Sequence, residues 1–376
     1  MVNKKRLIAL TQQLIRINSE NPGGNERAIA EFVKKFLEGL GIKARIYEFA
    51  KKRSNVVATV PGLFKNHSLL ITPHLDTVPA GTSWKLPPFS GVIRKGRLYG
   101  LGATDCKGNV ACALEVLRSL VEDKCILRYN LVFAATAEEE SGSSLGLIPL
   151  LDKGILACDA AVVLDSDDFD IVITQKGLMH LKVKLRGKKA HGAYPWLGIN
   201  AIDAAVALLH ELKQYHFKSE KNKYLLGPTV NIGTIHGGDK VNVVADWCEV
   251  ELDFRFLPGM SEKKFLENLK KIIRRHAHKF TIEIEGVQQP YCIEERHLLV
   301  RSLKAAMKKL NAESRVCGSE GATTVTFFQD KKIPAIATGF GSHECAHIAD
   351  EYVLVDNLYK GARVLEEFLK NYIKLT

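Results

Sequence analysis

Long apolar runs and paired cysteines are both missing from this sequence of 376 residues. The longest apolar stretches, such as Ala204 to Leu209, fall far short of the ~20 residues that a membrane-spanning helix needs. The eight cysteines form no CxxC pair and their spacing matches no zinc ribbon, which indicates reduced thiols rather than a disulfide scaffold. The first residues lack the unbroken apolar core of a signal peptide. We therefore expect a cytoplasmic protein whose apolar positions Leu7, Leu10 and Leu14 belong to a first amphipathic helix.

Acidic residues are outnumbered by basic ones, 42 against 53, which gives a formal net charge of +11 with histidine neutral. Such an excess raises the question of a nucleic-acid partner. However, the lysines and arginines are spread along the chain, and no basic stripe is interleaved with aromatic residues. The pattern is typical of a lysine-rich solvated surface with a weak attraction for small anionic substrates. We expect neither a nucleic-acid partner nor a membrane partner.

The length predicts two domains, and the apolar segments divide the chain accordingly. Residues 1–176 alternate helical periodicity with short apolar runs typical of buried strands, which is the α/β pattern. Residues 177–288 follow the order β-α-β-β-α-β of a ferredoxin-like split unit. Residues 289–376 return to α/β. The sequence thus predicts one domain formed by 1–176 and 289–376, with 177–288 inserted into it.

The expected elements follow from periodicity and from short apolar runs. Helices are expected over 27–40, 109–120, 145–151, 199–210, 265–276, 298–310 and 355–372. Strands are expected over 55–60, 68–72, 129–134, 160–164, 178–185, 229–235, 247–256, 280–285 and 333–338.

Five segments of the expected α/β domain carry metal-binding side chains at the ends of apolar elements. They read LLITPHLDTVP, YGLGATDCKGNVA, LVFAATAEEESGS, AAVVLDSDD and GFGSHECAHIADEYV, and they contain His74, Asp105, Glu140, Asp165 and His347. Each alone has a plain structural explanation, such as a helix N-cap for Asp105 or a solvated loop for the three glutamates. In an open parallel sheet, however, functional sites form outside the carboxyl ends of the strands. Five such positions together indicate a metal site.

Two further acidic groups have a chemical role beside these residues. Asp76 follows His74 by two positions, so both side chains point to one side if the strand continues. Its carboxylate would then accept a hydrogen bond from the imidazole and make it a better ligand. Among the adjacent glutamates, a cation would neutralise one while another transfers protons.

In this order, HLDTVP, GATDCKG, EEESG, VLDSD, GKKAHGAYPWLGINAI and AHIADEY resemble a known family. It is the acetylornithine deacetylase, succinyl-diaminopimelate desuccinylase, aminoacylase and glutamate carboxypeptidase family of co-catalytic zinc hydrolases. The resemblance covers essentially the whole chain. It implies a zinc-peptidase-like α/β catalytic domain with a mixed sheet and with 177–288 as an inserted lid and dimerisation domain. It also implies two zinc ions, for which cobalt or manganese could substitute.

The resemblance assigns the metal ligands residue by residue. His74 and Asp165 would bind one zinc ion, Glu140 and His347 would bind the other, and Asp105 would bridge both. Three carboxylates and one bridging hydroxide would balance the charge of the two ions, so that a neutral centre could lie in a partly dry cleft. The likeness also implies a cis peptide bond after Asp105.

Catalytic and substrate-binding roles are implied in the same way. Glu139, the first glutamate of the EExG pattern, would be the general base, and Asp76 would orient His74. His191 resembles a lid histidine that reaches the active site of the partner subunit and polarises the scissile carbonyl. Substrate contacts are implied for Asn242, Arg255 and Glu320.

The predicted activity is removal of an acetyl or succinyl group from an N-acyl amino or diamino acid by a metal-bound hydroxide, in a homodimer that serves amino-acid biosynthesis. A dipeptidase or carboxypeptidase of the same family is the alternative. Asp165 is Glu in many acyl-amino-acid deacylases and Asp in several peptidase relatives, so it does not favour a specific assignment. Cys106, where Met is usual, and Glu138, where Asp is common, are further departures. A hypothesis from another function class is an inactive relative that binds peptide or nucleic acid. The intact ligand set and Glu139 argue against it.

Overall fold

The computed structural model describes residues 1–372 and contains two compact units. Unit 1 comprises Met1–Ile173, Ile293–Cys317 and the chain from Phe327 onward. Unit 2 comprises Thr174–Cys292 together with the short stretch Gly318–Thr326. Within the described residues, no helix combines the length and the apolar character that crossing a bilayer requires. The assignment of 177–288 as a lid and dimerisation domain stays a prediction.

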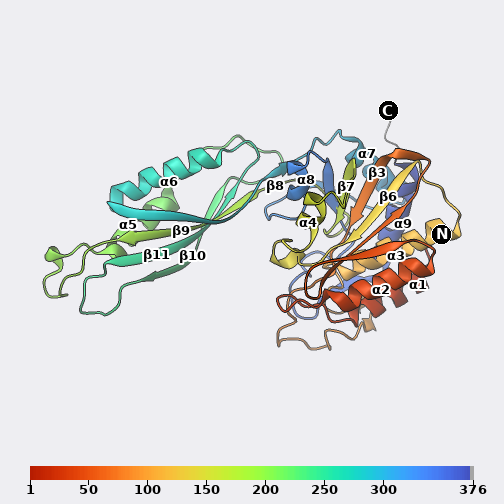
Figure 1. Ribbon diagram of the computed structural model, residues 1–376, viewed down its shortest axis with the longest axis horizontal. Coiled ribbons are helices and arrows are strands. Elements are labelled where there is room, and N and C mark those ends of the chain that lie inside the picture. The colour runs from red at the N-terminus through yellow and green to blue at the C-terminus, as the bar shows by residue number, and fades with distance from the viewer. Residues whose placement is uncertain (373–376) are drawn as a thin grey trace. The chain divides into compact units, whose positions relative to one another are not determined.

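The large sheet has the strand order β1-β2-β6-β3-β7-β15-β8-β13, and β14 pairs with β8. Its strands are β1 (Ala44–Ala50), β2 (Arg53–Val60), β3 (Phe64–Thr72), β6 (Tyr129–Ala135), β7 (Ala160–Leu164), β8 (Ile171–Gln175), β13 (Tyr291–Cys292), β14 (Val316–Ser319) and β15 (Ala335–Thr338). The four neighbours β6, β3, β7 and β15 are parallel, whereas the outer pairs are antiparallel. Figure 1 shows β3, β6 and β7 side by side. The sheet is therefore mixed, as the fold class predicted.

The parallel strands end at the same level. Thr72 is paired with Val163, and Thr338 is paired with Leu164, so β3, β7 and β15 end within one residue of one another. His74 extends the pairing by an isolated bridge to Thr136, just past β6. Residues that follow these strands are thereby brought to one edge of the sheet, because the carboxyl ends of parallel strands share an edge.

Helices of unit 1 pack on one another and on the sheet. They are α1 (Lys4–Ile15), α2 (Glu26–Gly39), α3 (Lys107–Glu122), α4 (Leu147–Asp152), α7 (Leu298–Lys309), α8 (Thr326–Asp330) and α9 (Val355–Asn371). Helix α3 packs against α1 and α9, which explains why its residues are buried on nearly all sides. Helix α2 packs on β1 and β2 through an apolar stripe at helical spacing. A small sheet of β4 (Ile93–Arg94), β5 (Arg97–Tyr99) and β16 (Tyr352–Leu354) completes the unit.

Unit 2 has the order β9 (Gly177–Arg186), α5 (Ala201–Gln214), β10 (Thr229–Gly237), β11 (Trp247–Phe256), α6 (Glu262–His276) and β12 (Lys279–Gln288). Its sheet order is β10-β11-β9-β12, and all neighbours are antiparallel. Burial alternates along β9 and β11, and the buried side chains pack against α5 and α6 in one core. The other face pairs its charges, as in Lys182 with Glu251 and Glu285. This is the split unit that the sequence predicted.

Most predicted elements are present with shifts of a few residues at their ends. The sequence did not predict β1 and β8, nor the short strands β4, β5, β13, β14 and β16. Strand β1 lies at the edge of the large sheet and is mostly half-exposed, so it lacks the apolar run that marks a buried strand. The two- and three-residue strands are too short to show any periodicity.

Gly361 in α9 provides a test of how tightly this helix is fixed to the end of β15. A Cβ atom at Gly361 would lie 2.1 Å from Cγ of Phe340, a fully buried residue just after β15. Gly361→Ala should therefore lower the free energy of unfolding by about 1–3 kcal/mol in a urea titration, because overpacking forces the neighbours apart. Gly39→Ala at the end of α2 is the matched control, since in residues 1–372 no atom outside its two chain neighbours and the backbone of its own helix lies within 4 Å of the added carbon. The control should raise the free energy of unfolding by at most about 1 kcal/mol, because alanine favours the helix more than glycine does. Equal stabilities for the two variants would contradict the packing described.

Candidate metal centre

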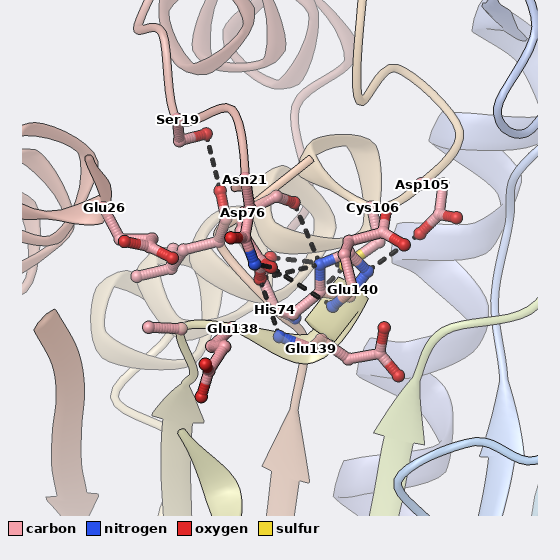
Figure 2. Close-up of polar contacts among 12 residues, drawn as sticks. Ser19, Asn21, Glu26, His74, Asp76, Asp105, Cys106, Glu138, Glu139 and Glu140 are labelled. Atoms are coloured by element: carbon pink, nitrogen blue, oxygen red, sulfur yellow. Dashed lines mark hydrogen bonds and ion pairs between the residues drawn. The ribbon is translucent and has the colours of Figure 1, made fainter. Parts of the chain in front are cut away.

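The five predicted metal ligands come from separate parts of unit 1 and meet at the carboxyl edge of its parallel strands. His74 follows β3, Glu140 lies in the 3₁₀ turn Glu139–Ser141 after β6, and Asp165 follows β7 directly. Asp105 stands just before α3, and His347 lies in the loop after β15. Figure 2 shows three of them, His74, Asp105 and Glu140, gathered with Glu139.

Asp105 lies between the two imidazoles. Its Oδ1 is 2.8 Å from Nε2 of His74, and its Oδ2 is 3.1 Å from Nε2 of His347. On the first side, Oδ1 of Asp165 is 3.7 Å from the same His74 nitrogen. On the second side, Oε2 of Glu140 is 3.0 Å from the His347 nitrogen. The two oxygens of one carboxylate thus face two different nitrogen donors, each with a further carboxylate beside it.

The ligand atoms form compact groups that suit a divalent transition metal. The donor atoms of Asp105, Glu140 and His347 all lie within 4.8 Å of one another, and so do those of His74, Glu139 and Asp165. Imidazole nitrogen with carboxylate oxygen is a donor set that zinc, cobalt and manganese accept. The chemistry of these residues therefore fits two cations.

Burial opposes the charge of these carboxylates, but the imidazoles offset it at Asp105. Burial raises the pKa of Glu139 far above its usual range, and the neighbouring Asp165 carboxylate raises it further. Burial acts in the same direction on Asp105, but hydrogen bonds with His347 and His74 outweigh it and lower the pKa of Asp105. Several carboxylates at such short range repel one another and need positive charge in their midst.

The two imidazoles respond to the same field. Hydrogen bonds with Asp105 and Glu140 raise the pKa of His347 to about 10. Burial disfavours a charged His74, yet hydrogen bonds with the carboxylates around it, Asp105, Asp165 and Asp76, raise its pKa well above the usual value. A divalent cation competes with these protons for the same nitrogen lone pairs and supplies the same positive charge.

Cys106 lies beside the ligands but is not a thiolate. Its Sγ accepts a hydrogen bond from the backbone N–H of His74 at 3.2 Å and donates one to the carbonyl of His74 at 3.3 Å. Burial raises the pKa of this thiol to about 12. Cys106 therefore ties the end of β3 to the start of α3. The peptide bond between Asp105 and Cys106 is cis, as predicted.

Asp76 lies beside His74, as the sequence predicted, and it also binds the backbone of the glutamate turn. Nδ1 of His74 is 3.0 Å from the backbone carbonyl of Asp76 and 3.5 Å from its carboxylate, so the carbonyl is the closer partner. The carboxylate accepts hydrogen bonds from the backbone N–H groups of Glu139 at 3.0 Å and Glu140 at 3.2 Å, and from Nδ2 of Asn21 at 3.0 Å (Figure 2). An Nδ1–H donated to the carbonyl leaves the Nε2 lone pair of His74 for a cation. Asp76 thereby positions the imidazole of His74 and the glutamate turn together.

A buried ion pair supports Asp76 through Asn21, and no feature of the sequence predicted it. Nη1 of Arg53 is 2.8 Å from Oε1 of Glu26, and its Nη2 donates to Oδ1 of Asn21 at 3.0 Å. The same Nη2 is 3.5 Å from Oε1 of Glu138, the residue before the glutamate turn. These residues come from the start of α2, the start of β2 and two loops, so only the tertiary structure brings them together.

The substrate-binding and lid residues predicted from the resemblance all belong to unit 2. His191 and Asn242 are neighbours, because the N–H of Gly192 donates to the carbonyl of Asn242 at 2.8 Å and His191 bridges to Val243. Among the contacts of the described residues, none joins Arg255 or Glu320 to His191 or Asn242.

Arg255 and Glu320 have ionic partners of their own. The guanidinium of Arg255 donates two hydrogen bonds to the carboxylate of Asp253, from Nε to Oδ1 at 2.8 Å and from Nη2 to Oδ2 at 2.9 Å. Glu320 pairs with the buried Lys176 at 2.5 Å and accepts the N–H of Leu226. A substrate carboxylate would have to compete with Asp253 for Arg255, which the sequence prediction did not foresee.

Comparison with known proteins agrees with this architecture. The model of peptidase family M20/M25/M40 matches residues 70–371. A metallohydrolase of uncharacterised activity from Methanocaldococcus jannaschii is 30% identical, over 96% of this chain and 98% of its own. A probable succinyl-diaminopimelate desuccinylase from Staphylococcus aureus is 26% identical, over 99% of this chain and 98% of its own. Among solved structures, a tripeptidase from Staphylococcus aureus superposes with a TM-score of 0.83 at 24% identity, over 98% of both chains.

The matched region contains all five residues that meet at the sheet edge. The match confirms the family that the ordered motifs predicted, and the superposition confirms the predicted fold class. The chain therefore belongs to peptidase family M20/M25/M40, and it is a metallohydrolase that acts on amide bonds.

Proposed function

We propose that this protein removes an acetyl or succinyl group from an N-acyl amino or diamino acid, with two zinc ions held by His74, Asp105, Glu140, Asp165 and His347. Cobalt or manganese could replace zinc, since the donors are nitrogen and oxygen. The observation that carries the proposal is the Asp105 carboxylate, whose two oxygens face the imidazoles of His74 and His347 at 2.8 and 3.1 Å. The desuccinylase named among its relatives supports the choice of acyl group.

Glu139 is the proposed general base. A pair of divalent ions, when bound, polarises the amide carbonyl and makes a water molecule more acidic. The backbone N–H of Glu139 is fixed by Asp76, and its carboxylate lies within 4.8 Å of the donor atoms of His74 and Asp165. Burial favours a proton on this carboxylate, so Glu139 suits a group that takes a proton from the attacking water and delivers it to the leaving amine.

A dipeptidase or carboxypeptidase is the second candidate, and Asp165 keeps it open. Asp165 supplies the shorter carboxylate at a position that is Glu in many deacylases of this family and Asp in several peptidases. Both reactions break an amide bond beside a carboxylate-bearing group, and the net charge of +11 attracts such anionic substrates in either case.

We also propose that the protein is a homodimer formed through unit 2. Strand β10 lies at the edge of its sheet, so one row of its backbone groups is free to pair. Large apolar side chains are exposed in the same unit, among them Trp196 at 73% and Val241 at 104%. A dimer would also give His191 a partner active site to serve. Sedimentation velocity that shows only monomers would contradict it.

The cytoplasmic location and the independence from nucleic acid and membranes stay predictions.

Replacing Glu139 tests the mechanism separately from metal binding. Glu139→Gln should lower kcat by about 10²–10⁴-fold, because the amide cannot accept the proton of the attacking water. Its metal content, measured by inductively coupled plasma mass spectrometry after dialysis, should equal that of the wild type. Glu344→Gln, in the exposed part of the loop that leads to His347, is the matched control and should keep both properties. Loss of metal from Glu139→Gln would make Glu139 a ligand instead of a base.

A substrate panel tests the proposed reaction. N-acetylornithine, N-succinyl-diaminopimelate and a set of dipeptides would be assayed with the zinc and the cobalt forms of the enzyme. We expect the highest kcat/KM on one of the two acyl diamino acids. Cleavage of dipeptides alone would reject the deacylase and leave the peptidase.

A further inference from the structure

Glu351 is a fully buried glutamate whose carboxylate binds the backbone of one loop. Its Oε1 accepts hydrogen bonds from the N–H groups of Thr104 at 2.8 Å and Asp105 at 3.0 Å. Its Oε2 accepts the N–H of Gly102 at 2.9 Å, and its carbonyl oxygen accepts the N–H of Gly100 at 2.9 Å. All four donors belong to the loop that leads to Asp105, the carboxylate proposed to bridge the two ions.

The same loop is joined to the segment that carries His347 by a second set of bonds. Oγ1 of Thr104 donates to the carbonyl of Tyr352 at 2.7 Å and accepts the N–H of Ser342 at 3.0 Å. Tyr352 is also paired with Tyr99 where β16 meets β5. Asp105 and His347 are far apart in sequence, yet the loop before Asp105 is hydrogen-bonded to Ser342, Glu351 and Tyr352, which flank His347 on both sides.

A carboxylate suits this position better than a neutral acceptor. An ionised carboxylate has two oxygens and no hydrogen, so it can accept from both sides at once. Hydrogen bonds to a charged acceptor are also stronger than neutral ones, which matters for a buried loop with no regular secondary structure to pair its N–H groups. The bonds from Gly102, Thr104 and Asp105 account for both carboxylate oxygens of Glu351.

We propose that Glu351 is a positioning residue for the metal pair: it fixes the backbone of Asp105 so that the two carboxylate oxygens of Asp105 face His74 and His347. This inference rests on the proposed function, because it takes Asp105 as the bridging ligand. Since both ions share Asp105, a shift of its backbone weakens both sites together. Loss of a terminal ligand such as His347 would weaken one site more than the other.

Glu351→Gln tests this role with little change in shape. The amide keeps one acceptor oxygen but turns an N–H donor toward the donors of the loop, so Asp105 should move. We expect the affinity for zinc, measured by chelator competition on metal-depleted protein, to fall by about 10- to 100-fold at both sites. The visible absorption of the cobalt form should change, because the ligand geometry around the ions changes. The kcat should fall with little change in KM, since Glu351 is fully buried and has no exposed surface to offer a substrate.

Glu115→Gln is the matched control. Glu115 is another fully buried glutamate of unit 1 and lies in the middle of α3. It accepts the N–H of Asn3 and pairs with Arg6 of α1. We expect this variant to lose stability but to keep the metal affinity and the cobalt spectrum of the wild type. A Glu351→Gln protein that behaves like the control, less stable but with unchanged metal affinity, would overturn the inference.

The failure of this inference and the failure of the proposed function are distinguishable. If Glu351→Gln does not fold, Glu351→Asp keeps the charge but shortens the side chain, and it should still bind both ions more weakly than the wild type; wild-type affinity in that variant would overturn the inference. If the wild type itself holds no pair of ions, the proposed function fails first, and the inference fails with it. If the wild type holds the pair and Glu351→Gln binds it equally well, only the role of Glu351 is rejected.

Discussion

Carboxylates repel one another at short range, and this protein gathers four of them around two imidazoles at one edge of a sheet. Asp105, Glu139, Glu140 and Asp165 all lie near His74 or His347, and His74 is buried. The free energy of such an arrangement is favourable only with positive charge between the oxygens. The parallel register of β3, β6 and β7, the turn after β6 and the loop before α3 all serve to bring these groups to that edge.

The support for the ligands is largely backbone bonding by buried carboxylates. Asp76 accepts the N–H groups of Glu139 and Glu140, and Glu351 accepts those of the loop that leads to Asp105. In both cases one acidic side chain fixes the main chain of a ligand segment rather than the ligand side chain itself. A rigid main chain limits how far the carboxylates can move apart, which preserves a site that their mutual repulsion opposes.

The sequence predicted the parts of this site that follow long apolar strands. Asp165 stands directly after β7, whose residues are all buried, and His74 follows the buried second half of β3, and such runs are easy to recognise. The identity of Asp105 and Glu140 as ligands depended on the ordered motifs. The contact of His74 with the carbonyl of Asp76 could not be predicted, because it depends on how the chain turns after β3. The pairing of Arg255 with Asp253 left a signal in the sequence, since residues two apart in a strand share a face. Arg53 left none, because its partners Glu26, Asn21 and Glu138 are distant in sequence.

If Asp105 holds two ions between two histidines, crystals grown with zinc and measured above and below the zinc absorption edge will show it. We expect two anomalous peaks in unit 1, one beside His74 and Asp165 and one beside Glu140 and His347, with Asp105 in contact with both. Two peaks that do not share Asp105, or a single peak away from these five residues, would contradict it.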